Sequence, residues 1–116
     1  MDRKSKPCKK LRWIYYQCYS EKKDNAALET ALGEGAFLVD VRTPVEFASG
    51  SAEGAVNIPL DVVKDQISKF RNKKNIIVFC RSGNRSAMAK GTLERNGITN
   101  VLNGGSVQNM IKLTEQ

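Results

Sequence analysis

The sequence predicts an α/β domain in which a central, mainly parallel sheet of about five strands carries helices on both faces. Short apolar runs of strand length alternate along the chain with stretches whose apolar residues recur at helical spacing. The connections are short, and capping residues precede several of the helical stretches. Such alternation is typical of parallel sheets covered on both faces. At 116 residues the chain is long enough for one domain with one core.

Strands are expected where β-branched and aromatic residues gather between polar stretches. Such runs occupy residues 36–39, 56–58, 76–79 and 101–102, and a candidate edge strand covers residues 13–19. The run at 76–79 is entirely apolar and is bounded by polar residues. We therefore expect it to be a buried parallel strand.

Capping residues predict three of the helices, and in chain order they are Asp24, Thr43 and Ser86. Thr43 is followed by Pro44 at the first helical position and by Glu46, which would complete a capping box. Apolar residues recur at helical spacing over 60–70 and predict an amphipathic segment that faces the sheet. A last helix is expected at residues 107–113.

The net charge of +7 is concentrated at the N-terminus. Residues 1–23 contain eight basic and two acidic side chains, whereas residues 24–116 are nearly neutral. The single Trp and all three Tyr lie in the same N-terminal segment. Basic residues interleaved with aromatics can bind nucleic acid or anionic lipid, but a solvated tail followed by an edge strand explains them more simply. We divide the chain into a basic extension, residues 1–23, and a domain, residues 24–116.

The most informative segment is residues 78–86, where an apolar strand is followed by a polar loop that opens with Cys80 and by the start of a helix. Backbone N–H groups of the loop and the positive end of the helix dipole would converge on this cysteine. The chain contains no histidine, which excludes a Cys-His pair, a Ser-His-Asp triad and every His-dependent metal site. Cys80 could therefore become a thiolate only through backbone donors, the helix dipole, or Arg81 and Arg85.

Four segments of the chain, taken in order, resemble the rhodanese-like sulfurtransferases. They are residues 38–47 (LVDVRTPVEF), 54–59 (GAVNIP), 80–86 (CRSGNRS) and 103–105 (NGG). The resemblance covers about residues 24–113 and is that of a single-domain member of the family. It implies the family's three-layer fold, with a rhodanese-like domain over residues 24–116.

The resemblance also implies a sulfur-transfer reaction at Cys80. This cysteine would take a sulfane sulfur from a donor such as thiosulfate, hold it as a persulfide and pass it to a thiophilic acceptor such as cyanide or a thiol. The loop residues that would bind the anionic donor are Arg81, Ser82, Gly83, Asn84, Arg85 and Ser86. Asp40 and Arg42 are expected to give structural support by tying loops together. Neither a cofactor nor a metal is expected.

Two features depart from the family's usual pattern. Ser51 and Ala52 stand where a His-Ile pair is frequent, and no aromatic residue follows Gly104 and Gly105, where tryptophan is common. These positions resemble packing sites in the family. The departures therefore bear on local stability more than on catalysis.

Two alternatives from other functional classes remain. Cysteine phosphatases and arsenate reductases also place a cysteine loop at a helix N-terminus, but they have five residues between Cys and Arg, whereas this chain has four between Cys80 and Arg85. The second alternative is a persulfide carrier or docking module that does not turn over thiosulfate. The intact Cys80 argues against an inert module and leaves the carrier open.

The three cysteines, Cys8, Cys18 and Cys80, are an odd number without paired spacing, which argues against a disulfide framework. We expect a reducing, cytoplasmic location, with a periplasmic one as the alternative if a leader is missing from this sequence. No apolar run reaches the ~18 residues needed to span a membrane. The expected partners are a small anionic sulfur donor, a thiol or cyanide acceptor and, as an option, a protein sulfur acceptor. The sequence gives no clear sign of nucleic-acid or membrane binding.

Overall fold

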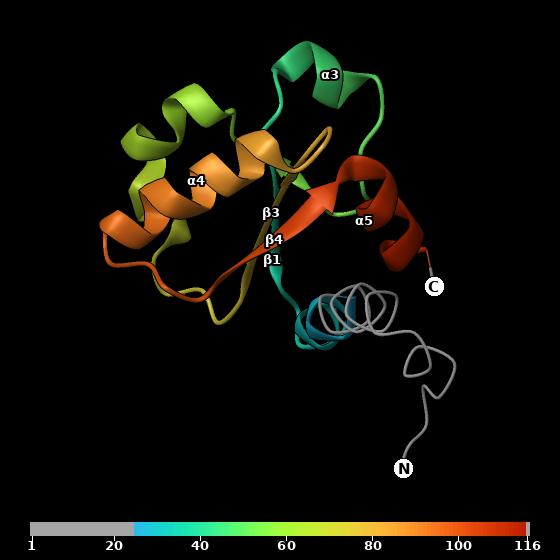
Figure 1. The fold of residues 1–116 in the computed structure, drawn as a ribbon, viewed down its shortest axis with the longest axis horizontal. Coiled ribbons are helices and arrows are strands. Elements are labelled where there is room, and N and C mark those ends of the chain that lie inside the picture. Colours follow the sequence, from blue (N-terminus) through green and yellow to red (C-terminus); the bar gives the residue numbers. More distant parts are fainter. Residues whose placement is uncertain (1–24, 116) are drawn as a thin grey trace, which may run out of the picture.

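The strands of the computed structural model form one parallel sheet in the order β2-β1-β3-β4. Figure 1 labels three of these strands, β1, β3 and β4, and the helices α3, α4 and α5. The structure describes residues 25–115. The strands are β1 (Phe37–Asp40), β2 (Val56–Asn57), β3 (Ile76–Cys80) and β4 (Val101–Ser106). The described part of the sheet thus has four strands where the sequence predicted about five. The candidate edge strand at residues 13–19 lies outside the described residues.

The central strand β3 is buried along its whole length, as its apolar sequence predicts. It pairs with β1 on one side and with β4 on the other. Near the carboxyl ends of these strands, Asp40 lies opposite Phe79, and Cys80 lies opposite Ser106. The register therefore places Cys80 at the carboxyl end of the central strand, where β1 and β4 also end.

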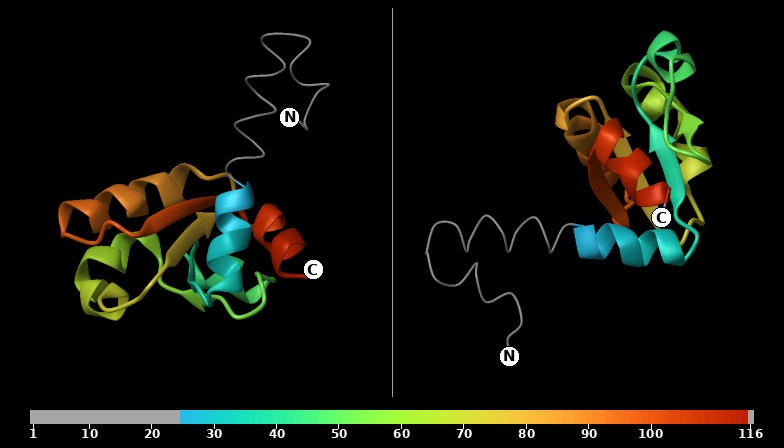
Figure 2. Two further views of the ribbon diagram at one scale, coloured as in Figure 1. Left: turned by 90° about the horizontal axis from the view of Figure 1, so that it is seen from below. Right: turned by 90° about the vertical axis from the view of Figure 1, so that its right-hand side faces the viewer.

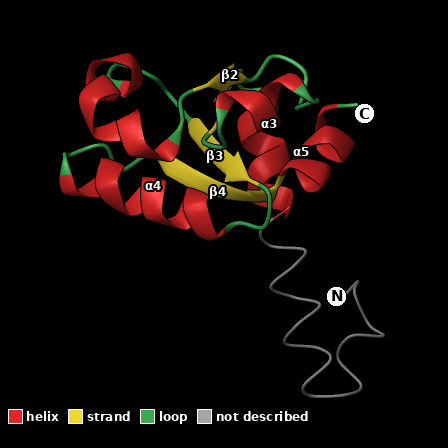
Figure 3. Ribbon diagram, turned by 90° about the horizontal axis from the view of Figure 1, so that it is seen from above, coloured by secondary structure: helices red, strands yellow, loops and turns green. Residues whose placement is uncertain are grey.

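Helices cover both faces of the sheet (Figure 3). The 3-10 segment η1 (Leu60–Phe70), which is kinked at Gln66, and helix α4 (Asn84–Arg95) pack on one face. The helix formed by residues 25–33 and helix α5 (Val107–Thr114) pack on the other face, where Figure 2 shows them close together. Within the described residues, no helix has the length and apolar content needed to span a bilayer.

Side chains alternate between two core clusters, as the period of a strand requires. The cluster under α4 and η1 contains Val39, Val41, Ile58, Val63, Phe70, Ile76, Val78, Cys80, Ala89, Leu93, Ile98 and Val101. The cluster under α5 contains Leu28, Ala31, Leu38, Ala52, Ile77, Phe79, Val107, Met110 and Leu113. Cys80 therefore belongs to the face that α4 covers.

Helix α3 (Pro44–Ala48) begins as the sequence predicts. Thr43 is its N-cap, and its hydroxyl accepts a hydrogen bond from the Glu46 backbone N–H. The Glu46 carboxylate in turn accepts one from the Thr43 N–H at 3.0 Å, so the predicted capping box is confirmed.

The start of α4 differs from the prediction, because the N-cap is Gly83 and Ser86 lies buried within the first turn. Gly83 has φ of 102°, a left-handed conformation that glycine adopts at little cost. This conformation turns the chain into the helix at Asn84. The prediction that Ser86 caps the helix is therefore wrong, and its hydroxyl instead bonds to Gly83 O and to Asn103.

Candidate active site at Cys80

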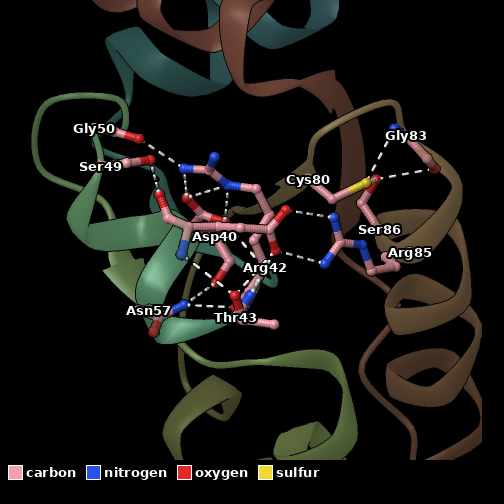
Figure 4. Close-up of polar contacts among 11 residues, drawn as sticks. Asp40, Arg42, Thr43, Ser49, Gly50, Asn57, Cys80, Gly83, Arg85 and Ser86 are labelled. Carbon is pink, nitrogen blue, oxygen red and sulfur yellow. Dashed lines mark hydrogen bonds and ion pairs between the residues drawn. The ribbon is translucent and has the colours of Figure 1, made fainter.

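Cys80 ends β3, and residues 81–83 carry the chain from it into α4. Its residue surface is 1% exposed. The Gly83 N–H donates a hydrogen bond to Cys80 Sγ at 3.0 Å, and the Ser86 Oγ lies 3.7 Å from the same sulfur (Figure 4). Backbone and side-chain groups at the start of a helix thus converge on one thiol, as the sequence predicted.

These groups alter the acidity of the thiol. Burial raises the pKa of Cys80, but hydrogen bonds from the Ser86 backbone and hydroxyl and from the backbone of Gly83 and Ser82 lower it by more. The net pKa of Cys80 is lower than the ordinary value for a thiol. The groups that lower the pKa of Cys80 are mainly backbone amides.

The predicted loop residues differ in how they lie relative to the sulfur. Arg81, Ser82 and Asn84 are exposed, Gly83 and Arg85 are half-buried, and Ser86 is buried. The loop thus turns its backbone toward Cys80 and leaves the Arg81 side chain facing solvent. Among the described residues, Arg81 forms no ion pair with a carboxylate.

The Arg85 side chain is held by Glu46 of α3. Nη1 lies 2.8 Å from Oε1 and Nη2 lies 3.1 Å from Oε2, so the pair is bidentate. The hydrogen bond to Arg85, with that from the Thr43 backbone, lowers the pKa of Glu46 to about 2. The same contact raises the pKa of Arg85, and the nearby Cys80 raises it further. Arg85 therefore joins α4 to α3, and its positive charge still interacts with Cys80.

Asp40 and Arg42 form a buried ion pair at the end of β1, with exposed fractions of 0% and 6%. Arg42 Nη2 lies 2.7 Å from Asp40 Oδ2 and donates to the Gly50 carbonyl at 2.7 Å (Figure 4). The Asn57 side chain donates to the carbonyls of both Asp40 and Arg42. The hydrogen bond to Asp40 raises the pKa of Arg42. These contacts tie the segments on either side of α3 to the sheet.

The residues that depart from the family pattern are hydrogen-bonded or packed in the core. Ser51 Oγ donates to Asp40 Oδ2 at 2.7 Å, and Ala52 is 5% exposed within the core. After Gly105, Ser106 caps α5 by accepting from the Asn109 N–H, and Val107 is buried. The departures therefore leave this part of the described chain hydrogen-bonded and packed.

Two residues of the site were not singled out as site residues from the sequence. Glu46 is predicted only as part of a capping box and of a motif, and Asn103 only as part of a motif. The Asn103 side chain contacts both Ser86 and Gly83. The sequence holds no signal for this contact, because it depends on the strand register, in which Asn103 lies opposite Val78, two residues before Cys80 on the central strand.

The part of the chain that the structure describes contains no group of three or more His, Cys, Asp or Glu side chains that could hold a metal. Cys80 is the only cysteine among residues 25–115 and is a free thiol. Cys8 and Cys18 lie outside the described residues.

The sequence and the fold match proteins of one family. The model of the rhodanese-like domain matches residues 24–108. The thiosulfate sulfurtransferase PspE of Escherichia coli is 36% identical over 74 residues, which cover 62% of this chain and 71% of that protein. An uncharacterized protein of Bacillus subtilis, YqhL, is 41% identical over 68 residues, which cover 59% of this chain and 54% of that protein.

A solved structure, a rhodanese with anions from E. coli, superimposes with a TM-score of 0.59 at 35% identity and covers 65% of this chain and 91% of that one. The chain spans about half to two-thirds of the length of the first curated relatives it matches. The match over residues 24–108 includes the cysteine loop and the sheet that positions it. This chain belongs to the rhodanese-like domain family.

Proposed function

We propose that this protein is a sulfurtransferase that moves a sulfane sulfur from a donor such as thiosulfate to a thiophilic acceptor, cyanide or a thiol, through a persulfide on Cys80. The observation that carries the proposal is the 3.0 Å hydrogen bond from the Gly83 N–H to Cys80 Sγ at the start of α4. The lowered pKa of Cys80 supports it, because the thiolate is the nucleophilic form. Sulfurtransferases among the relatives support the same reaction class.

The reaction has two balanced steps. The Cys80 thiolate attacks the sulfane sulfur of thiosulfate, a bond between the two sulfur atoms forms, and the sulfur–sulfur bond of thiosulfate breaks to release sulfite. The terminal sulfur of the persulfide then forms a bond to cyanide, the persulfide bond breaks, and thiocyanate leaves with the thiolate restored. Each step needs stabilisation of an anionic sulfur, which the converging amides and the helix N-terminus supply.

The loop residues take different roles in this proposal. Backbone groups of Ser82, Gly83 and Ser86 hydrogen-bond to the sulfur and stabilise its negative charge. Arg81 is exposed beside Cys80 and supplies the positive charge that meets an incoming anion. Arg85 adds a fixed positive charge near the sulfur while paired with Glu46.

The burial of Cys80 favours a small donor. The odd cysteine count favours a reducing, cytoplasmic location.

The test is steady-state formation of thiocyanate from thiosulfate and cyanide. Cys80→Ser should abolish turnover, because a hydroxyl cannot carry a persulfide. Arg81→Ala should raise KM for thiosulfate by about tenfold, the effect of removing one favourable charge contact worth about 1.4 kcal/mol. Arg95→Ala is a matched control, because Arg95 lies in the last turn of the same helix, away from the loop.

Turnover by Cys80→Ser would refute the proposed nucleophile. A wild-type protein that accepts sulfur from a persulfide donor but not from thiosulfate would instead be a carrier. Hydrolysis of an aryl phosphate by the wild-type protein would favour the phosphatase alternative.

A further inference from the structure

Asn103 is placed beside the cysteine loop by the register of β4. It pairs with Val78, and the next pair joins Phe79 to Gly105, so Gly104 is an extra residue in β4. A β-bulge of this kind is typical next to functional sites, where it redirects the chain. Val101, two residues before Asn103, packs in the cluster under α4. Strand alternation therefore places Asn103 on the face of the sheet that the first turn of α4 covers.

Both the nitrogen and the oxygen of the Asn103 carboxamide form hydrogen bonds, with Gly83, Ser86 and Gly105. Nδ2 donates to the Gly83 carbonyl at 3.2 Å. Oδ1 accepts from the Ser86 hydroxyl at 2.7 Å and from the Gly105 N–H at 2.9 Å. The Gly83 N–H and the Ser86 Oγ also lie 3.0 and 3.7 Å from Cys80 Sγ. One side chain thus holds two of the residues that contact the sulfur.

The loop needs these hydrogen bonds from Asn103, because a glycine at position 83 is free to adopt other conformations. Gly83 has φ of 102°, and as N-cap it offers no side chain to fix the start of the helix. A Cβ at this position would lie 3.4 Å from Gly105 Cα, so the loop also packs closely on β4. An amide side chain is suited to holding Gly83 and Ser86 together, because it offers both a hydrogen-bond donor and an acceptor.

We propose that Asn103 is a positioning residue for sulfur transfer, whose carboxamide holds Gly83 with its N–H directed at Cys80 Sγ and holds the Ser86 oxygen beside the same sulfur. The inference rests on the proposed function, in which Cys80 is the nucleophile that carries the sulfur. By holding the Gly83 N–H on the sulfur, Asn103 stabilises the thiolate and the anionic persulfide formed on it. Asn103 itself does not contact the reacting sulfur.

Charged groups lie in the loop and on the elements packed around Cys80. They are Arg81 in the loop, Arg85 on α4, Glu46 on α3, and Asp40 with Arg42 at the end of β1. None of their side chains hydrogen-bonds to Asn103 within residues 25–115. Lys90, which lines the same hollow as Asn103, is paired with Glu94 at 2.7 Å. An effect of Asn103 on Cys80 therefore passes through Gly83 and Ser86.

The experiment measures the rate of Cys80 alkylation by iodoacetamide against pH in the full chain, for Asn103→Ala, Asn103→Asp and Asn109→Ala. Asn103→Ala removes the hydrogen bonds to Gly83 and to Ser86 and should raise the apparent pKa of Cys80. Alkylation at pH 6 should therefore slow at least threefold. Asn103→Asp keeps the shape and the acceptor but loses the donor to Gly83 and adds negative charge. It should slow alkylation at pH 6 at least as much. Thermal melting of each variant reports whether it folds.

Asn109→Ala is the matched control. The Asn109 side chain also donates to a β4 carbonyl, that of Gly104 at 3.2 Å, but it makes no hydrogen bond to the loop. Its pH profile should equal that of the wild-type protein.

An unchanged profile in folded Asn103→Ala, or an equal shift in Asn109→Ala, would overturn the inference. If Asn103→Ala does not fold, the near-isosteric Asn103→Asp decides alone. Alkylation requires no sulfur donor, so failure of the wild-type protein to accept sulfur from thiosulfate would refute the proposed function separately.

Discussion

Glu46 and Arg85 form a bidentate ion pair that joins α3 to the first turn of α4, with N–O distances of 2.8 and 3.1 Å. The same carboxylate accepts from the Thr43 N–H and so completes the capping box that begins α3. The two side chains are 29% and 34% exposed, so solvent screens the pair. Its main effect is therefore to fix the segment around α3 beside the cysteine loop.

Glu46→Gln should lower the free energy of unfolding at neutral pH, because it removes the charged partner of Arg85. The folded-state pKa of Glu46 is about 2, below its ordinary value of 4.5, so its contribution is present above pH 4.5 and lost as pH falls toward 2. Urea unfolding between pH 7 and pH 3 should show the difference from the wild-type protein shrinking below about pH 4.5. A difference in unfolding free energy that stays constant over this pH range would show that the ionised Glu46 carboxylate does not stabilise the fold.

Asp40→Asn should destabilise the domain by about 3–5 kcal/mol, because it leaves the buried Arg42 guanidinium without its charged partner. Ser51→Ala removes only one hydrogen bond to the same carboxylate and should cost about 1 kcal/mol. The midpoint of urea unfolding measures both. Equal losses in the two variants would show that the ion pair is not the main contribution of Asp40.

Gly104→Ala should destabilise the protein by about 1–3 kcal/mol through overpacking. A Cβ there would lie 2.7 Å from Met110 Sδ and 2.9 Å from Ile77 Cγ2, both in the core. Gly33→Ala is the control, since nothing lies within 4 Å of a Cβ at that helical position. It should be neutral or stabilising by about 0.5–1 kcal/mol. Thermal melting distinguishes the two, and equal melting temperatures would refute the packing explanation.

Local patterns predicted most of the elements but not the partners of the loop. The apolar run in β3 and the capping box of Thr43 and Glu46 were predictable, because each depends on residues adjacent in sequence. The Ser86 cap was wrong, because the left-handed conformation of Gly83 determines where α4 begins. No sequence pattern reports this conformation unambiguously.

The contacts that complete the candidate site join distant residues. Arg85 and Glu46 are 39 positions apart, and Asn103 is 17 positions from Ser86. These pairs follow from strand order and from the bulge in β4, which appear only once the chain is folded. The cysteine that opens the loop and its backbone donors could be inferred from the sequence, whereas the side chains that hold the loop could not.

Removing residues 1–10 should leave the melting temperature and thiosulfate turnover unchanged, because the strong positive charge of this segment sets it apart from the nearly neutral residues 24–116. Extending the deletion through residue 19 should cost about 2 kcal/mol or more if residues 13–19 form an edge strand. The full chain and the chain lacking residues 1–10 should both show no salt-sensitive binding to nucleic acid or anionic vesicles. Binding that requires residues 1–10 and weakens steeply with salt would contradict the solvated-tail interpretation.

The most direct test of sulfur transfer through Cys80 is intact-mass spectrometry after incubation with thiosulfate, followed by peptide mapping. The wild-type protein should gain one sulfur atom on the peptide that contains Cys80 and lose it on addition of cyanide. The variant with Cys8→Ser and Cys18→Ser should behave in the same way, and Cys80→Ser should gain nothing. A wild-type protein that gains no sulfur, or that carries it on Cys8 or Cys18, would contradict the proposal.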